Sequence, residues 1–470
     1  MMKAFSYAFI CTLMLSGCAV EMPETLERKH QDLIPTQWTS GEGKEAASIV
    51  REKPQQWWAR WNNETLSFLV EKTLLNNTDI AQAQANLRSA QASLTKANSS
   101  LWPSFDIGAD ATDQWKNHDW TQGYSAEAAS KWSFNFGGRD IATQGAASAT
   151  TKAQALTLED TQSAVASEVV KTYIALCQAN EQLVILEKNV LSYEEGRNLA
   201  QWRHQAGLVS AIDAEQASAS YESMKAKIDT ARHSIHVYQT ALSRLAVLPL
   251  ATIKGLPAKG IPHAPDDLAV AIPADVISLR PDVQAARSSV IAALYKVRAA
   301  QADFFPTLSL SGSIGTTAAT VSALGASGTG IGALVGALSM PILNWGEAIA
   351  GTETQKAALD TAQAKYTAAL VRALEETENA LSQLRTTQSR QKSLLSAQKS
   401  SELAAQLALQ QYSSGLVDYE TVLSTLRSQL SAQEAVVDNQ SEQAQAYVEL
   451  YRALGGGWTP EVKDKEEKNG

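Results

Sequence analysis

The stretch "AAQADFFPTLSLSGSIG", residues 299–315, changes its pattern in the middle. Alanine-rich sequence typical of a helix stops at Pro306, and after it apolar residues, Leu308 first, alternate with serines. A proline ends a helix, and a period of two indicates a half-buried strand. The stretch "LTKANSSLWPSFDIGADAT", residues 94–112, makes the same change at Pro103. Two helix-to-strand changes in one chain indicate a duplicated architecture.

Further landmarks recur in the same order, about 200 residues apart, and define a tandem repeat. They are Pro103 with Pro306, Asn135-Phe136-Gly137 with Asn344-Trp345-Gly346, and Gly207-Leu208-Val209 with Gly415-Leu416-Val417. Residues 138–206 and 347–414 contain no proline and are rich in strong helix formers. At 1.5 Å per residue, each predicts a helix of roughly 100 Å. Residues 211–247 and 418–454 predict return helices of about half that length.

The alternating segments predict two pairs of strands, 103–112 with 125–136 and 307–315 with 331–342. Each is close to the roughly 9 to 11 residues that a tilted transmembrane strand needs. Four strands cannot close a barrel, and lipid does not tolerate an open sheet edge, so several copies of the chain must complete one. The alternative is a small soluble β-subdomain with one wet face.

The amino-terminal sequence predicts in which cellular compartment the protein is located. Lys3 precedes an apolar run over residues 4–15, which is too short to span a membrane and is typical of a signal peptide. The run ends in Leu15-Ser16-Gly17-Cys18, which looks like a bacterial lipobox and predicts a covalent lipid on Cys18. Cys177 then has no partner for a disulfide and is interpreted as a small buried hydrophobe.

Charge and composition argue against nucleic acid and against catalysis. The formal net charge is −9, whereas nucleic-acid binding needs basic patches. Of six histidines, only His233 and His236 share a helical face, and a two-histidine site lacks further metal ligands nearby. No phosphate-binding loop or nucleophile elbow is present. We therefore expect no enzyme activity, no metal and no cofactor other than the lipid on Cys18.

Several segments resemble the outer-membrane factor family of the TolC and OprM type, and within it the NodT-like lipoprotein branch that serves RND efflux. They are the lipobox, residues 57–91, the block 277–315 that contains Arg280-Pro281-Asp282, residues 343–351 and the two Gly-Leu-Val turns. The resemblance implies a mainly α protein with a membrane β-barrel. In it, a homotrimer completes a twelve-stranded barrel, with four strands from each protomer, over a long α-helical periplasmic tunnel. It also implies a passive export duct in the outer membrane that works with a periplasmic adaptor (membrane fusion protein) and an inner-membrane RND or MFS pump.

The resemblance places the closed end of the tunnel at the two Gly-Leu-Val turns. The candidate gate residues are those of the turns and the acids that follow them: Gly207, Leu208, Val209, Asp213, Glu215, Gly415, Leu416, Val417, Asp418 and Glu420. Three-fold symmetry would repeat each carboxylate around the pore, where rings of acid select for cations. The alternative is a solvated acidic helix end. TolC-type members carry two aspartates where this chain has Thr421 and Ser424, so a constriction at those two positions is not expected.

The predicted organisation follows from these landmarks, with helix–strand junctions at Pro103, Gly137, Pro306 and Gly346. It comprises a lipoprotein signal peptide (1–17), an acylated amino-terminal segment (18–60), a first repeat (61–248, strands about 103–136), a proline-rich linker (249–272), a second repeat (273–454, strands about 307–342) and a charged disordered tail (455–470). Small-molecule efflux is the favoured function. Type I protein secretion through the same kind of duct and a periplasmic lipoprotein scaffold that does not span the membrane are the alternatives.

Overall fold

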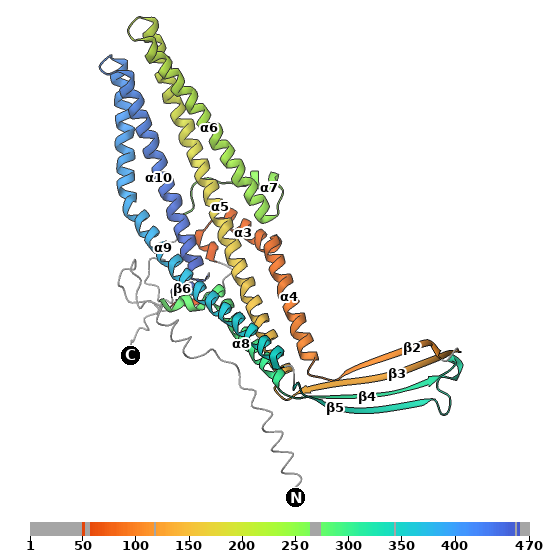
Figure 1. Cartoon of the computed structure of the whole chain (residues 1–470). Coiled ribbons are helices and arrows are strands. Elements are labelled where there is room, and N and C mark those ends of the chain that lie inside the picture. Colours follow the sequence, from red (N-terminus) through yellow and green to blue (C-terminus); the bar gives the residue numbers. More distant parts are fainter. Residues whose placement is uncertain are drawn as a thin grey trace, which may run out of the picture. The chain divides into compact units, whose positions relative to one another are not determined.

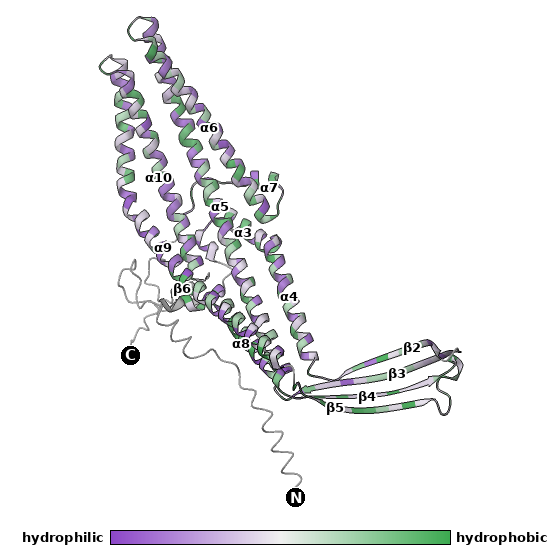
Figure 2. Ribbon diagram, in the orientation of Figure 1, coloured by the Kyte–Doolittle hydropathy of each residue, from purple (hydrophilic) through white to green (hydrophobic). Residues whose placement is uncertain are grey.

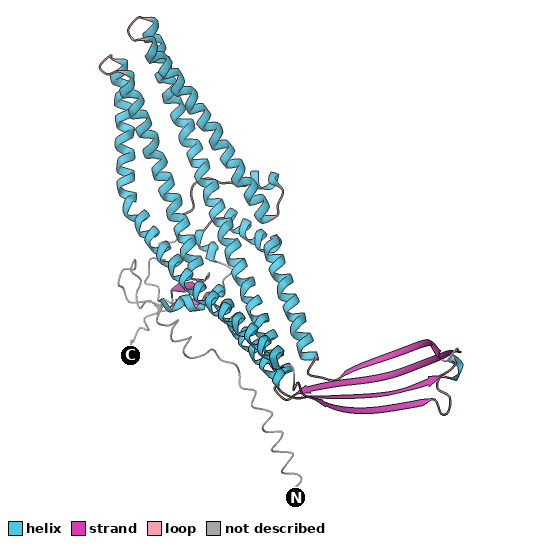
Figure 3. Ribbon diagram, viewed as in Figure 1, coloured by secondary structure: helices cyan, strands magenta, loops and turns pink. Residues whose placement is uncertain are grey.

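The structure, a computed structural model, describes residues 49–51, 57–116, 119–263, 274–342, 345–455 and 458–460. The signal peptide, Cys18 and the tail from residue 461 lie outside the described residues. The described residues are mainly helical, with one four-stranded sheet and a short strand pair (Figures 1 and 3). The chain forms two compact units. One contains the described residues of 84–157 and 282–369, and the other contains those of 49–83, 158–281 and 370–460.

The sheet belongs to the first unit and is built from both repeats. Its order is β2-β3-β4-β5, and every neighbouring pair is antiparallel (Figure 1). The strands are β2 (Ser104–Lys116), β3 (Asp119–Asn135), β4 (Thr307–Ala318) and β5 (Gly330–Ser339). Each repeat therefore contributes one hairpin, and the β3–β4 pairing, which sets Asn135 opposite Thr307, joins the two.

The first hairpin is longer than the sequence predicts. Residues 113–116 and 119–124, expected to be a loop, continue β2 and β3. The reason is a cross-strand aromatic pair, because Trp115 lies opposite Trp120 with ring centroids 5.4 Å apart. Such pairs stabilise a ladder. In the second hairpin the segment between the strands holds only the short 3-10 helix η5 (Val321–Ala323).

The register gives the sheet one apolar and one polar face, as the alternation predicted. Residues directly opposite each other in antiparallel strands share a face. The apolar face carries Phe105, Ile107, Trp132, Phe134, Leu308, Leu310, Ile314, Leu334 and Leu338. The polar face carries Ser104, Asp106, Asp110, Glu127, Lys131, Ser309, Ser311, Ser313 and Thr317, and β5 adds the apolar Ile331 and Val335 to it. The apolar side chains are not covered in the single chain, since Ile107 is 91% and Leu334 is 86% exposed.

The same unit contains the helical segments that lead into and out of the sheet. They are most of α4 (Thr78–Ser99), the start of α5 (Arg139–Gln205), nearly all of α8 (Pro281–Gln301) followed by η4 (Ala302–Phe304), and the start of α9 (Trp345–Ser413). Small residues allow these helices to approach closely. Gly145 of α5 lies against Tyr295 of α8, where a Cβ would be 2.6 Å from the ring. Thr151 donates a hydrogen bond to the Ala90 carbonyl of α4.

The second unit contains the larger parts of two antiparallel helical hairpins, α5 with α6 (Ala211–Ala246) and α9 with α10 (Tyr419–Ala453) (Figure 1). The long helices have 67 and 69 residues and the return helices 36 and 35, which confirms the predicted halving. The half-length α6 meets α3 (Glu64–Asn76) at its end, where the Asn77 amide donates to the Leu245 carbonyl at 3.0 Å. Shorter elements are β1 (Ile49–Arg51), η1 (Trp57–Trp61), α7 (Leu250–Lys254), η3 (Ala274–Leu279) and β6 (Trp458–Pro460), with β1 antiparallel to β6.

Two apolar cores hold this unit together. The tryptophan core surrounds Trp57, Trp58 and Trp61 and includes residues 166–177 of α5 and 444–454 of α10. The turn core lies near the two hairpin turns and includes Tyr193 of α5, Tyr412 of α9 and Leu426 of α10. Along the helices, hydrophobic and hydrophilic residues are interspersed, as expected for helices with one buried stripe (Figure 2).

Candidate functional site

The first hairpin turn closes α5 in a Schellman arrangement. The Gly207 N–H donates to the His204 carbonyl at 2.9 Å, and the Leu208 N–H donates to the Arg203 carbonyl at 2.8 Å. This pattern requires a left-handed residue, and Gly207 has φ of +70°. The glycine predicted from the repeat is therefore the residue that ends the helix.

The second turn repeats this geometry in α9. Gly415 has φ of +77°, and its N–H donates to the Tyr412 carbonyl at 2.9 Å. The Leu416 N–H donates to the Gln411 carbonyl at 2.9 Å. In both turns the leucine is exposed, and the valine that follows, Val209 or Val417, is half-buried. The two repeats thus present the same small apolar surface at their turns.

The two candidate aspartates cap the return helices. Ser210 and Asp213 form a reciprocal capping box at the start of α6, with both backbone-to-side-chain distances at 3.2 Å. Asp418 is the N-cap of α10 and accepts hydrogen bonds from the Thr421 hydroxyl at 2.6 Å and the Thr421 N–H at 2.8 Å. The Thr421 hydroxyl bond, followed by its N–H, lowers the pKa of Asp418 below its ordinary value. Both aspartates therefore have a local role in the helix starts, while Glu215 and Glu420 are exposed.

A contact that the sequence did not predict joins the two turns. Arg203 of α5 donates from its guanidinium to the Tyr412 carbonyl of α9. The same guanidinium lies over the Tyr412 ring, 4.7 Å from the centroid. Arg203 precedes Gly207 by one helical turn, and this position beside the predicted turn is the only sequence signal that could have indicated its role. The partner on α9 is visible only in three dimensions.

Two buried tyrosines, Tyr412 and Tyr419, lie next to this contact. Tyr412 and Tyr419 are each 1% exposed, and their rings meet edge to face with centroids 5.6 Å apart. Burial raises the pKa of Tyr419 to about 12, so it stays neutral at physiological pH. Tyr419 also lies beside Gly196 of α5, where a Cβ would come within 3.5 Å of its ring. The two hairpins are therefore packed against each other close to their turns.

The helix–strand junctions of the two repeats interlock. The Asn135 amide donates to the Thr307 hydroxyl at 3.0 Å, and its side-chain oxygen accepts from the Gly137 N–H at 2.8 Å. Gly137 is required by close approach, since a Cβ there would lie 2.8 Å from the Ala302 Cα. The Pro306 carbonyl accepts from the Phe136 N–H at 3.0 Å.

The remaining junction residues are placed more loosely. Pro103 is half-buried directly before β2, near the point where the Trp132 indole donates to the Leu101 carbonyl at 3.2 Å. Gly346 is the second residue of α9, and open space surrounds it. Of the four junction residues, Gly137 and Pro306 therefore have the closest contacts with the other repeat.

Most charged residues of the sheet lie on its polar face. Asp106, Asp110 and Glu127 lie there with Lys131, and the register pair Lys116–Asp119 is on the same face, whereas Asp113 is on the apolar face. Glu127 faces a glycine on each neighbouring strand, Gly108 and Gly315, which leaves room above the backbone for its side chain. The polar face thus carries more negative than positive charge among the described strand residues.

Two further observations bear on the kind of site. Among the described helices, none combines the length and the apolarity needed to cross a membrane. Cys177 is buried beside Tyr173, and burial raises the pKa of its thiol to about 12, as expected for an inert core residue.

Comparison with known proteins gives consistent matches over nearly the whole chain. The family model "Outer membrane efflux protein" matches residues 69–246 and 272–456, one segment in each repeat. The pyoverdine export outer membrane protein OpmQ of Pseudomonas aeruginosa is 28% identical over 487 residues, covering 97% of both chains. The toluene efflux pump outer membrane protein TtgF of Pseudomonas putida is 25% identical over 473 residues, covering 97% of this chain and 98% of its own.

Solved structures have the same fold. The outer-membrane channel OprN superposes with a TM-score of 0.80 at 27% identity, covering 90% of this chain and 98% of that chain. The CmeC outer membrane channel of Campylobacter jejuni gives a TM-score of 0.82 at 24% identity, covering 89% of this chain and 90% of its own.

Proposed function

The chain belongs to the outer membrane efflux protein family, and from that premise we propose that it forms a passive trimeric duct that carries small amphipathic compounds out of the cell. It is an outer-membrane channel protein of an efflux system.

The observation that carries the proposal is the two-sided sheet. Its apolar face is built to contact lipid, and its polar face is built to line a water-filled lumen. In the single chain β2 and β5 each have one unpaired edge within the described sheet. Open edges are not tolerated in a bilayer, so β2 of one protomer pairs with β5 of the next. Three copies arranged in a ring give a closed barrel with an even number of antiparallel strands.

The hairpin turns supply the docking surface for a periplasmic adaptor. Leu208 is 67% and Leu416 is 75% exposed, and each directly follows the left-handed glycine of its turn. Small exposed apolar anchors on a rigid base are what a helical partner recognises. The adaptor then couples the duct to an inner-membrane pump of the RND or MFS class. A lipid on Cys18 anchors the amino terminus to the outer membrane, as the lipobox predicts.

An accumulation assay tests the proposed function in cells. A strain lacking this chain would receive either the wild-type gene or a version without residues 307–340, which removes β4 and β5. Ethidium and bile-salt accumulation should rise on deletion and fall only with the wild-type copy. If no compound accumulates although the trimer is intact in the outer membrane, small-molecule efflux is rejected in favour of protein secretion. If the chain is recovered only as a periplasmic lipoprotein without heat-modifiable oligomers, the scaffold alternative is correct.

A further inference from the structure

A groove lies among the three helices of the sheet-containing unit that adjoin β2, β3 and β4. Its floor is α5, which contacts α4 through the Thr151–Ala90 hydrogen bond on one side and α8 through Gly145 and Tyr295 on the other. The groove has a volume of about 730 Å³, within the roughly 300–1,000 Å³ that small-molecule sites occupy. We call it the lysine groove, lined by Lys96 and Ala97 of α4, Ala146, Ala147 and Thr150 of α5, and Lys296 of α8.

The surface of the lysine groove is largely apolar, although serines and threonines are common in it. The hydroxyls of Ser93, Thr143 and Thr150, which line it, donate to backbone carbonyls of their own helices at 3.0, 2.8 and 2.8 Å. Their hydrogens are therefore not available to a ligand. Alanines from all three helices line the groove as well. A ligand that fits this surface has an apolar body.

The two lysines give the groove its charge. Lys96 and Lys296 come from the helices on either side of α5, and both are exposed. Neither lysine has an ion pair or a hydrogen bond within the described part of the chain. No aspartate or glutamate is among the described residues that line the groove. The positive charge is therefore uncompensated there, and it attracts anions.

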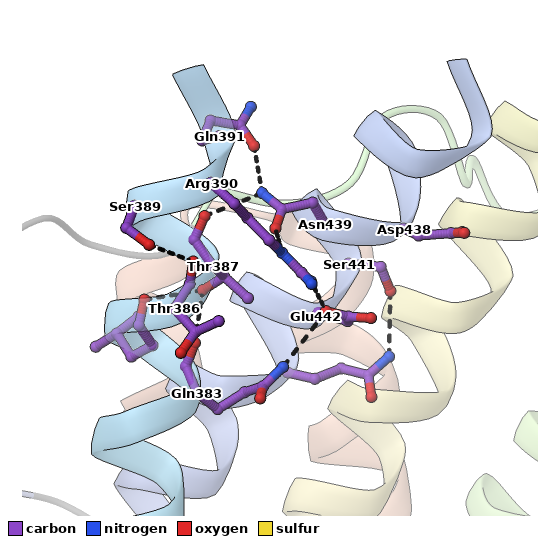
Figure 4. A network of polar contacts seen from close by, with 12 residues as sticks. Gln383, Thr386, Thr387, Ser389, Arg390, Gln391, Asp438, Asn439, Ser441 and Glu442 are labelled. Carbon is purple, nitrogen blue, oxygen red and sulfur yellow. Dashed lines mark hydrogen bonds and ion pairs between the residues drawn. The ribbon is translucent and has the colours of Figure 1, made fainter. Parts of the chain in front are cut away.

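A cation of the second unit is compensated by the chain itself. The half-buried Arg390 of α9 donates to the Asn439 side-chain oxygen and to the Glu442 carboxylate of α10 (Figure 4). The acid of this cluster satisfies its cation, so the cluster offers a ligand no free charge. The lysine groove differs from it, because its two cations have no acid beside them among the described lining residues.

The lysine groove opens on the side of the helices that the proposed duct encloses. Ile141 of α5 is 54% exposed, and an exposed isoleucine directly after the sheet belongs on the lipid-facing side. Thr143 and Thr150 lie two and nine residues from Ile141. At about 100° per residue, both are on the opposite side of α5. The groove therefore faces the lumen, as the polar face of the sheet does.

We propose that the lysine groove is a binding site for amphipathic anions, compounds with an apolar ring body and one negatively charged head. The body lies on the alanines of the floor, and the head accepts charge-assisted hydrogen bonds from the ammonium groups of Lys96 and Lys296. Only the position of the site in the lumen rests on the proposed function. There it holds anionic cargo beside a sheet whose polar face is mainly acidic and repels anions.

Equilibrium binding of taurocholate, which has a steroid body and one sulfonate, tests the site. The full-length trimer would be held in nanodiscs of neutral lipid, with empty nanodiscs as the blank. The wild type should bind taurocholate with an affinity that falls as the salt concentration rises. Lys96→Gln with Lys296→Gln should weaken binding about tenfold and remove most of the salt dependence, since each partly screened ion contact supplies a few-fold in affinity.

The matched control is Lys152→Gln, which removes an exposed lysine of α5 on the same side of the helix as Ile141. It should bind taurocholate as the wild type does. Ethidium, an apolar ring body with a positive charge, should bind no more weakly to the double variant than to the wild type. Equal taurocholate affinities in the double variant and the control would refute the site.

A second variant tests the apolar part of the groove with both lysines in place. Ser93→Trp introduces an indole from an exposed position of α4 that lines the groove, and it should abolish taurocholate binding. Its control is Gln91→Trp, because Gln91 is exposed two residues away and so lies across the helix. If Ser93→Trp binds taurocholate as well as Gln91→Trp does, the anion binds elsewhere and the site is wrong. If Ser93→Trp does not assemble, the lysine variants decide.

Conductance in planar bilayers separates this inference from the proposed function. Taurocholate should reduce the conductance of the wild type at concentrations that leave the double lysine variant unaffected. Lysine-dependent binding in a protein that forms no pore would retain the site and reject the duct. A conducting protein whose taurocholate binding does not depend on the two lysines would retain the duct and reject the site.

Discussion

Arg280 is a buried cation between η3 and α8, near the start of the second repeat, and its ion pair gives a quantitative prediction. Its side chain is 3% exposed and donates to the Glu376 carboxylate of α9 at 2.7 Å and to the Ala453 carbonyl of α10 at 3.1 Å. Glu376 is 33% exposed and can still reach water. Glu376→Leu should therefore cost about 3 kcal/mol, because it removes a charged hydrogen bond from a buried guanidinium. Arg280→Met should cost less, about 1–2 kcal/mol, because the Ala453 carbonyl loses a hydrogen bond but no unpaired charge is buried in its place.

Tryptophan fluorescence can follow unfolding near this ion pair, because Trp57 stacks on Tyr451 close to the end of α10 with ring centroids 5.0 Å apart. Guanidinium unfolding of the detergent-solubilised protein, followed by tryptophan fluorescence, gives the free energy of unfolding for each variant. The double variant Arg280→Met with Glu376→Leu should be more stable than Glu376→Leu alone. Equal costs for the two single changes, or a cost below about 1 kcal/mol for Glu376→Leu, would refute the reasoning.

Three further predictions follow from the caps, the sheet faces and the helix packing. Asp418→Ala should lower the melting temperature and Asp418→Asn should not, because asparagine also caps a helix. Since the pKa of Asp418 is lowered in the folded protein, its stabilisation is present above about pH 4 and is lost as the pH falls through the folded pKa. If the melting temperature of the wild type does not approach that of Asp418→Ala as the pH falls through this range, the capping role is contradicted. If Asp418 also closes the gate, Asp418→Ala should conduct more than the wild type, and unchanged conductance would reject that role. Ile107→Lys on the apolar face should cost about 2–4 kcal/mol and reduce the yield of heat-modifiable trimer, whereas Asp106→Lys on the polar face should assemble normally; equal yields would disprove the facing. Gly145→Ala should cost about 1–3 kcal/mol in thermal unfolding, because its Cβ would lie 2.6 Å from the Tyr295 ring. Adding Tyr295→Ala should remove the part of this cost that is due to the overlap. If the costs of the two single changes simply add in the double variant, the overlap is excluded as the cause.

The sequence predicted the elements whose signals are local. Pro103 and Pro306 mark the starts of β2 and β4, and Gly207 and Gly415 end the two long helices. These positions depend on backbone geometry, which proline and glycine determine within a few residues. Strand alternation likewise predicted which face Ile107 occupies.

The features that the sequence did not predict depend on distant partners. The extension of β2 and β3 rests on the Trp115–Trp120 pair, which a turn-rich composition concealed. Arg203 is a polar residue in a helix, and from sequence alone such a residue is interpreted as part of a solvated face. It is half-buried because α9 lies opposite, and no local periodicity indicates that.

Blocking the pore from one face of a single strand tests the central claim, that the polar face of the sheet lines a duct. Ala128 lies on the apolar face of β3 and Ala129, its neighbour, on the polar face. Each would be changed to cysteine, and conductance would be recorded in planar bilayers before and after addition of a bulky, water-soluble polyethylene glycol maleimide. The account predicts that conductance falls for Ala129→Cys and is unaffected for Ala128→Cys. A block at Ala128→Cys instead, or no effect at either position in a conducting protein, would contradict it.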